Sequence, residues 1–282
     1  MPGRRLFVPL LGLLLAGLLA ACATAPVTGR SQLLLVSEEY AISASEPAYF
    51  KLLSGPAREG RLNRDPALRA RVRRIAGRLI HQAIRLRPET AGWKWSIHVI
   101  DDPETVNAWA MAGGRMALYS GLVEKLSTSD DELAQVLGHE IAHALARHTA
   151  EKMSVALATD LAVTAWAVKE NKDRTALAGA ALAAALVVKL PNSRRAEAEA
   201  DRIGVELAAR AGYDPRAAVS LWRKMSKLDK GRLPEFLSTH PSDESRIEAL
   251  QELVPRMMPL YRAPGERGAY QFRPEAEALP GS

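Results

Sequence analysis

Cysteine is nearly absent from this chain: the only one among 282 residues is Cys22. A disulfide within the chain is therefore excluded, even in an oxidising compartment that would permit one. Aromatic residues are also sparse, at 5% of the chain. The arginines between Arg58 and Arg74 have few aromatic neighbours, which is unlike a nucleic-acid stacking platform, so we expect no nucleic-acid partner. We interpret them as a solvated helical face, with contact to anionic lipid headgroups as the alternative.

Apolar runs long enough to cross a bilayer are missing as well. Leu6–Leu18, Val155–Val168 and Leu177–Val188 are each shorter than the roughly 20 residues that a span needs. The first of these runs follows Arg4 and Arg5 and precedes a small-residue processing site, a pattern typical of a secretion signal over residues 1–21. We therefore leave residues 1–21 out of the fold prediction.

Cys22 ends this processing site, Leu19-Ala20-Ala21-Cys22, and its position resembles a bacterial lipobox. In a lipobox the cysteine is lipidated and becomes the first mature residue. The next residues, Ala23 and Thr24, lack the aspartate that would resemble an inner-membrane retention signal. The sequence thus predicts a lipid anchor in the outer membrane of a diderm bacterium, with the protein facing the periplasm.

The remaining residues are sufficient for one sizeable core, since the chain is 48% apolar and about 260 residues follow the signal. Loss of Arg4 and Arg5 lowers the formal charge from +6 to +4, a mild basic excess. We expect a linker over residues 22–36, one domain over 37–254, and a loosely ordered tail over 255–282, where proline and glycine are frequent.

Hydrophobic periodicity predicts a mostly helical α+β domain. Helices are expected at Pro66–Leu86, Arg216–Leu228 and Asp243–Leu253. Period-two alternation predicts three short strands that form a small antiparallel sheet around Gly113-Gly114, at Trp93–Ile100, Val106–Met111 and Arg115–Ser120. The Ala-rich block from Val155 to Val188 predicts a helical hairpin packed on the core, with an apolar face resting on a membrane or partner as the alternative.

The run His139-Glu140-Ile141-Ala142-His143 carries the clearest chemistry. Ser129-Asp130-Asp131-Glu132 reads as a capping box, which places the run about two turns into a helix. Residues four apart lie on one helix face, so both imidazoles can bind one metal ion while Glu140 borders the site. This is the geometry of a zinc site with a general base beside its water. The alternative is an amphipathic helix with two histidines on its polar face.

A third ligand is expected downstream, in the carboxylate-rich segment Arg195–Asp201. Catalytic zinc commonly takes two histidines, one glutamate and a water, and Glu197 fits the third role. Asp201 lies one turn later and could accept the spare N–H of a ligating histidine, which would fix the ring. The alternative is a solvated helix face of alternating Glu and Ala.

Together these two segments resemble the zinc endopeptidases related to the CAAX prenyl proteases, in their bacterial outer-membrane lipoprotein branch (BepA-like and LoiP-like). The resemblance runs from about Thr28 to Leu250. Its other marks are Thr28–Gln32, Val36–Glu39, Asn107–Ala110, Gly113-Gly114, Ser238–Pro241 and Arg246-Ile247. In this family the glutamate four residues before the aspartate is the metal ligand, which maps to Glu197 rather than Glu199.

The resemblance implies a zincin-type (gluzincin) peptidase domain with one Zn²⁺ per subunit, held by His139, His143 and Glu197. Glu140 would take a proton from the water and pass it to the leaving amine. A substrate strand would add to an open sheet edge. We expect that edge at Met116, Ala117, Leu118 and Tyr119, directly before the active-site helix. Asn107 could hydrogen-bond the substrate backbone or shape a turn.

His240, in Thr239-His240-Pro241, is expected on a loop with one of three roles. It could stabilise the oxyanion, occupy the open coordination position as a latch, or be a plain surface histidine. We expect His148 to be a packing or cap residue, because it lies roughly 140° around the helix from His143. His81 and His98 have no partner motif, and a structural role is expected for both.

The predicted function is proteolytic quality control: hydrolysis of internal peptide bonds in misfolded or misassembled envelope proteins, with contact to the outer-membrane assembly machinery. The rival is a periplasmic chaperone or assembly factor with latent or minor protease activity, although a binding module has no need of Glu140. A CAAX-type processing enzyme is disfavoured, because those relatives work within a membrane and this chain lacks their spans. BepA-like relatives continue into helical repeats, which we do not expect in this chain.

Overall fold

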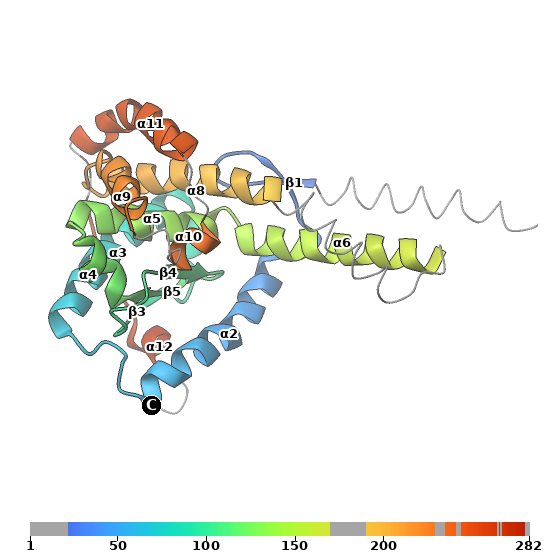
Figure 1. Ribbon diagram of the computed structural model, residues 1–282, viewed down its shortest axis with the longest axis horizontal. Coiled ribbons are helices and arrows are strands. Elements are labelled where there is room, and N and C mark those ends of the chain that lie inside the picture. The colour runs from blue at the N-terminus through green and yellow to red at the C-terminus, as the bar shows by residue number, and fades with distance from the viewer. Residues whose placement is uncertain are drawn as a thin grey trace, which may run out of the picture.

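The computed structural model describes residues 22–169, 190–228, 235–240, 244–263, 265 and 267–279 (Figure 1). Helices dominate, with a three-stranded and a two-stranded sheet. The helices are α2 (Glu38–Arg58), α3 (Pro66–Leu86), α4 (Ser120–Leu126), α5 (Asp130–Leu145), α6 (His148–Lys169), α8 (Leu190–Arg210), α9 (Ala217–Met225), α10 (Glu235–Thr239), α11 (Glu244–Arg262) and α12 (Pro274–Glu277), with a 3-10 turn at Pro88–Gly92. The strands are β1 (Cys22–Thr24), β2 (Ser31–Leu33), β3 (Ser96–Ile100), β4 (Ala108–Met111) and β5 (Arg115–Tyr119). The predicted mostly helical α+β class is confirmed.

The central helix α5 begins at the predicted capping box. The Ser129 side chain accepts the Glu132 N–H, and the Glu132 carboxylate accepts the Ser129 N–H. Glu132 also binds Ser220 and Lys224 of α9, which ties the start of α5 to its neighbour. Every residue from Glu132 to Leu145 is buried. The histidine motif therefore lies inside the core and not on a solvated face.

Helices α5 and α8 cross with their backbones in direct contact, and two glycines make this possible (Figure 1). A Cβ atom on Gly138 would lie 2.8 Å from the Gly204 carbonyl oxygen. A Cβ atom on Gly204 would lie 2.7 Å from the His139 nitrogen. Contacts this close exclude any side chain at either position. The crossing brings the α8 carboxylates beside the α5 histidines.

The three-stranded sheet lies against α5 in the order β3-β5-β4. β4 pairs antiparallel with β5, as predicted, but β3 pairs with β5 in parallel, so the sheet is mixed. The prediction that Met116–Tyr119 form an open edge is wrong, because β5 is bonded on both sides. β5 is buried except at Tyr119, with Met116 and Leu118 fully inaccessible to solvent. The edge strand beside α5 is β4.

The Ala-rich block is described only in part. Val155–Val168 lies within α6, which extends away from the sheet and carries exposed Leu157, Leu161 and Trp166 (Figure 1). Leu177–Val188 lies outside the described residues, so the hairpin prediction is not tested. Among the residues that the structure does describe, no helix combines the length and apolar character needed to cross a membrane.

Both ends of the described chain are packed on the domain, contrary to two expectations. Within the segment 22–36, expected to be a linker, β1 and β2 form a hairpin (Cys22–Leu33), and Gln32 in β2 is buried. The tail expected to be loose from 255 onward continues α11 to Arg262, then returns through Tyr270, whose N–H donates to Gly77. Arg73 binds the Glu277 carboxylate, and Arg115 donates to the Ala276 carbonyl. Composition suggested disorder, but these long-range contacts hold the tail in place.

Substitution of Gly204 by Ala should destabilise the protein by about 1–3 kcal/mol, the usual range for overpacking a well-packed core. The added methyl group has no space between α8 and the His139 backbone. Chemical denaturation of the full chain measures this directly. Gly55→Ala in α2 is the matched control, since nothing lies within 4 Å of a Cβ there and helical alanine is favoured. Equal midpoints for the two variants would contradict the tight crossing.

Candidate metal centre

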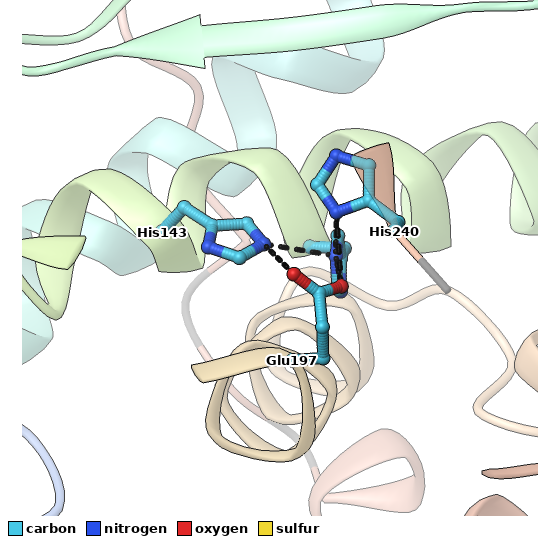
Figure 2. A group of neighbouring side chains, drawn as sticks. His143, Glu197 and His240 are labelled. Carbon is cyan, nitrogen blue, oxygen red and sulfur yellow. Dashed lines mark hydrogen bonds and ion pairs between the residues drawn. The ribbon is translucent and has the colours of Figure 1, made fainter. Parts of the chain in front are cut away.

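Four buried side chains from three elements converge on one point: His139 and His143 from α5, Glu197 from α8, and His240 just after α10 (Figure 2). Their ligand atoms all lie within 4.8 Å of one another. The two Nε2 atoms of His139 and His143 are 3.0 Å apart. The Glu197 carboxylate lies 3.2 Å from His139 Nε2 and 3.5 Å from His143 Nε2. The predicted ligands are thus brought together.

The donor set fits a tetrahedral metal ion. Bonds of about 2.0–2.1 Å place neighbouring ligand atoms about 3.3–3.4 Å apart. The separations around this point are close to that value, at 3.0, 3.2 and 3.5 Å. Glu197 Oε1 is also buried without a hydrogen-bond partner. A buried carboxylate oxygen requires a partner, and a cation supplies one.

The pKa shifts of these clustered side chains also favour a bound cation. Burial disfavours a charge on Glu197, but hydrogen bonds with His139 and His240 outweigh it and hold the pKa of Glu197 well below its usual range. Burial likewise opposes charge on His139, yet Asp201 and Glu197 raise the pKa of His139 to about 9. Burial and the adjacent His139 keep the pKa of His143 well below its usual value. The carboxylates therefore favour one positive charge at this point, as a metal site must.

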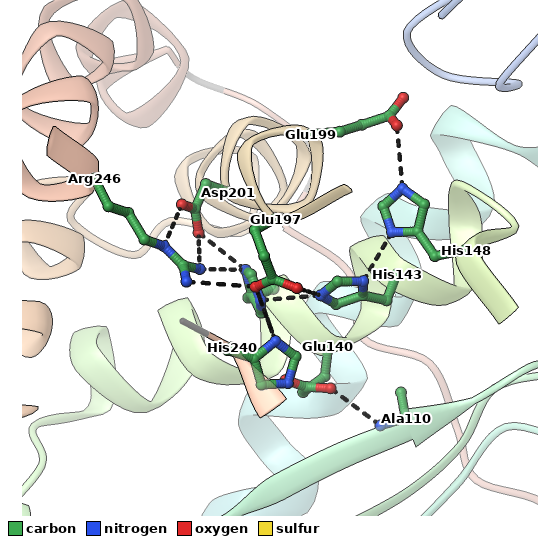
Figure 3. A network of polar contacts seen from close by, with 10 residues as sticks. Ala110, Glu140, His143, His148, Glu197, Glu199, Asp201, His240 and Arg246 are labelled. Atoms are coloured by element: carbon green, nitrogen blue, oxygen red, sulfur yellow. Dashed lines mark hydrogen bonds and ion pairs between the residues drawn. The ribbon is translucent and has the colours of Figure 1, made fainter. Parts of the chain in front are cut away.

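Asp201 lies at the nitrogen of the His139 ring that does not face Glu197, and Figure 3 shows it between Arg246 and the cluster. Its carboxylate lies 2.9 Å from His139 Nδ1, which leaves Nε2 turned toward the cluster. Arg246 of α11 binds both Asp201 oxygens at 2.7 Å, and its guanidinium stacks 3.7 Å above the Trp222 ring. Burial raises the pKa of Asp201, but Arg246 and His139 outweigh it and lower this pKa overall. Asp201 is therefore an ionised, fixed acceptor.

Glu140 points from α5 toward the sheet and not toward Glu197 (Figure 3). Its Oε2 accepts the Ala110 N–H of β4 at 3.2 Å. Its Oε1 is buried, has no hydrogen-bond partner and lies 3.4 Å from His240 Nε2. An unpartnered carboxylate oxygen between the edge strand and the ligands is well placed to accept a proton from water.

His240 lies among the ligands and not on the surface, so the plain surface role is wrong. Its Nδ1 is 2.9 Å from Glu197 Oε2 and 3.2 Å from His139 Nε2 (Figure 2). Only 7% of the residue is exposed, which is comparable to the ligands themselves. In this arrangement, the His240 ring lies where a fourth metal ligand would lie.

The residues predicted to hold substrate have other contacts. Met116–Tyr119 lie in the centre of the sheet. The Asn107 side-chain oxygen accepts the N–H of Ala108, the next residue, which supports the interpretation that Asn107 shapes the start of β4. The Ala110 N–H, in contrast, points out of the sheet to Glu140. The free edge of β4 therefore faces the cluster.

The sequence did not predict that His148 would contact the ligand His143. His148 contacts His143 Nδ1 at 2.7 Å and Glu199 at 3.1 Å, whereas we expected only packing or capping (Figure 3). The turn between α5 and α6 brings the two imidazoles together, and helical periodicity through that turn does not predict it. His98 has a structural role, as expected, with its Nδ1 bonded to the Tyr49 hydroxyl.

Comparison with known proteins agrees with this geometry. The model of Peptidase family M48 matches residues 66–254. The chain is 35% identical to the mitochondrial metalloendopeptidase OMA1 of Bos taurus over 249 residues, covering 83% of this chain and 46% of that protein. It is 31% identical to the beta-barrel assembly-enhancing protease of Escherichia coli over 225 residues, covering 75% and 43%. The chain therefore belongs to peptidase family M48.

The family-level resemblance inferred from the sequence is confirmed by these matches. The chain spans about half the length of the curated relatives it matches. The relatives come from two settings, since one group is named mitochondrial and the other is named for β-barrel assembly.

Replacement of Glu197 by Gln should remove most of the bound metal, because a neutral amide is a poor ligand and the compensating negative charge is lost. Metal analysis after dialysis measures this as a fall from about one ion per chain in the parent. Glu206→Gln, on the same helix but paired with Arg210, is the matched control and should keep its metal. Full metal content in Glu197→Gln would show that the cluster is not the binding site.

Proposed function

We propose that this chain is a zinc-dependent endopeptidase that hydrolyses internal peptide bonds. The observation that carries the proposal is the convergence of His139, His143 and Glu197 beside Glu140. These three residues would hold zinc, which would supply Lewis acidity for activating water and polarising the scissile carbonyl. Family membership and the names of the M48 relatives support the assignment.

Glu140 is the general base in this proposal. The Ala110 N–H holds one of its oxygens and leaves the other free toward the ligands. Glu140 takes a proton from the attacking water and delivers it to the leaving amine. Burial excludes bulk water from the carboxylate, so the proton remains available for that second transfer.

The substrate is an extended chain that adds to the free edge of β4. The outward N–H of Ala110 shows that this edge faces Glu140. Backbone pairing recognises any extended peptide, with side-chain pockets adding selectivity. A site of this kind suits unfolded segments, because a folded protein has its strands already paired. Misfolded or misassembled envelope proteins are the substrates that we propose.

The proposed location is the outer membrane, with the domain facing the periplasm. The signal-like residues 1–21 and the lipobox-like Cys22 support it. Two bacterial relatives are named beta-barrel assembly-enhancing proteases, which supports contact with outer-membrane assembly. The rival function is a chaperone or assembly factor with minor protease activity. This rival predicts that the Glu140→Gln variant, which lacks the general base, still supports envelope integrity.

His240 acts as a latch in this proposal. Its ring nitrogen lies 2.9 Å from Glu197 and 3.2 Å from His139, where it would exclude water from a metal held by His139, His143 and Glu197. The residue follows the short α10, and its N–H donates to Phe236, so displacement of this one turn would open the site. The alternative role is donation to the oxyanion.

Glu140→Gln should bind zinc like the parent but cleave an unfolded test protein such as casein about 10²–10⁴-fold more slowly, the usual range for a general acid–base group. Zinc content and cleavage rate are measured on the same preparation. Glu124→Gln, an exposed change on α4, controls for loss of charge and should cleave normally. Parental cleavage by zinc-loaded Glu140→Gln would refute the proposed mechanism.

His240→Ala should raise the cleavage rate several-fold, because the open position becomes available to water without movement of α10. An oxyanion donor would behave in the opposite way, since its loss lowers the rate by about 10²–10³-fold. Initial rates on the same unfolded substrate distinguish the two roles. A large decrease in the cleavage rate would therefore show that His240 stabilises the oxyanion and does not act as a latch.

A further inference from the structure

A second chain of polar contacts leads away from the metal centre in the direction opposite to Asp201 (Figure 3). His143 Nδ1 lies 2.7 Å from His148 Nδ1, and His148 Nε2 lies 3.1 Å from Glu199 Oε2. His148 is 2% exposed and Glu199 is 6% exposed. The proposed function gives neither residue a role, although His148 touches a ligand.

Only one arrangement of protons suits this chain of contacts. A metal at the cluster takes the lone pair of His143 Nε2, so His143 Nδ1 carries the proton and donates it. His148 Nδ1 must then be the acceptor, and its Nε2–H donates to the Glu199 carboxylate. Each donor has one acceptor, and the His143 ring is held with Nε2 toward Glu197. This is the arrangement that Asp201 provides for His139.

The outer end of the chain of contacts belongs to the N-terminal hairpin. The Glu199 carboxylate accepts hydrogen bonds from the Thr28 hydroxyl and from Arg30 Nε, the latter at 2.5 Å. Arg30 also binds both oxygens of Glu151 on α6, at 2.6 and 2.9 Å. Gln32 donates to Glu151 and to the Ala146 carbonyl, at the end of α5. The hairpin thus joins α5, α6 and α8 behind His143.

We propose that His148 and Glu199 are positioning residues that fix the ring of the metal ligand His143. We further propose that Thr28 and Arg30 make this positioning depend on docking of the N-terminal hairpin. The inference rests on the zinc centre proposed above. Cys22, the proposed lipidation site, begins the same hairpin. A pull or displacement at the anchored end would therefore loosen one ligand of the metal.

The first test measures zinc affinity by competition with a chelator, in the full chain and without substrate. His148→Phe keeps the ring shape but loses both hydrogen bonds, and should weaken zinc binding by about 10–100-fold, as loss of such partners does at other metal sites. His148→Gln carries both an acceptor and a donor, and should recover most of the affinity. Parental affinity in His148→Phe would overturn the proposal.

His98→Phe is the matched control for the loss of a buried histidine. His98 on β3 is 5% exposed and bonds to the Tyr49 hydroxyl, not to a ligand of the metal centre. This variant should lower the melting temperature while leaving zinc affinity at the parental value. If it weakens zinc binding as much as His148→Phe, the effect of His148 is general destabilisation and the proposal fails.

The second test addresses the hairpin. Arg30→Gln should weaken zinc binding in the parent but add little in the His148→Phe background, because both changes act through one chain of contacts. Arg61→Gln, which breaks an ion pair with Glu59 outside this network, is the control and should have no effect. Fully additive losses, or parental affinity in Arg30→Gln, would overturn the hairpin's role. Since no substrate is present, a protein that binds zinc but cleaves nothing would refute the proposed function and leave this inference intact.

Discussion

The site depends on the direct backbone contact between α5 and α8 at Gly138 and Gly204. Gly138 immediately precedes His139, and Gly204 lies one turn beyond Asp201. With no side chain between the helices, Asp201 reaches Nδ1 of His139 while Glu197, one turn earlier, reaches the Nε2 face. A wider crossing would leave these carboxylates short of the imidazoles. The geometry of the candidate metal site and the packing of the two helices are thus two consequences of one contact.

A cluster this polar inside a core is stable only when each group has a partner. Here the partners come from separate parts of the chain. Arg246 of α11 neutralises Asp201 behind one histidine, and Arg30 of the N-terminal hairpin neutralises Glu199 behind the other. The side facing β4 and α10 is different, since one oxygen of Glu140 there has no hydrogen-bond partner. The closed contacts therefore position the site, and the unpartnered oxygen of Glu140 is the one to which we assign proton transfer.

The features that were predicted correctly are those that depend on residues close together in the sequence. The capping box at Ser129, the helical spacing of His139 and His143, and the start of α3 at Pro66 each depend on residues a few positions apart. Spacing within one helix, together with the family resemblance, indicated Glu197 as the third ligand. Long-range order was harder to predict. Nothing in the strand residues indicates that β5 inserts between β3 and β4, and the contacts of His148 depend on a turn and on residues more than 50 positions away. Tail packing was missed for the same reason, because composition does not encode a partner such as Arg73.

X-ray absorption at the zinc edge of the full-length, zinc-loaded chain tests the central claim most directly, because it reports the atoms that surround the metal. The account predicts nitrogen and oxygen neighbours only, at about 2.0–2.2 Å, with scattering from two or three imidazole rings. A sulfur neighbour at about 2.3 Å would place the metal at Cys22 instead. A shell of oxygen atoms without imidazole would likewise contradict a metal centre built by the crossing of α5 and α8.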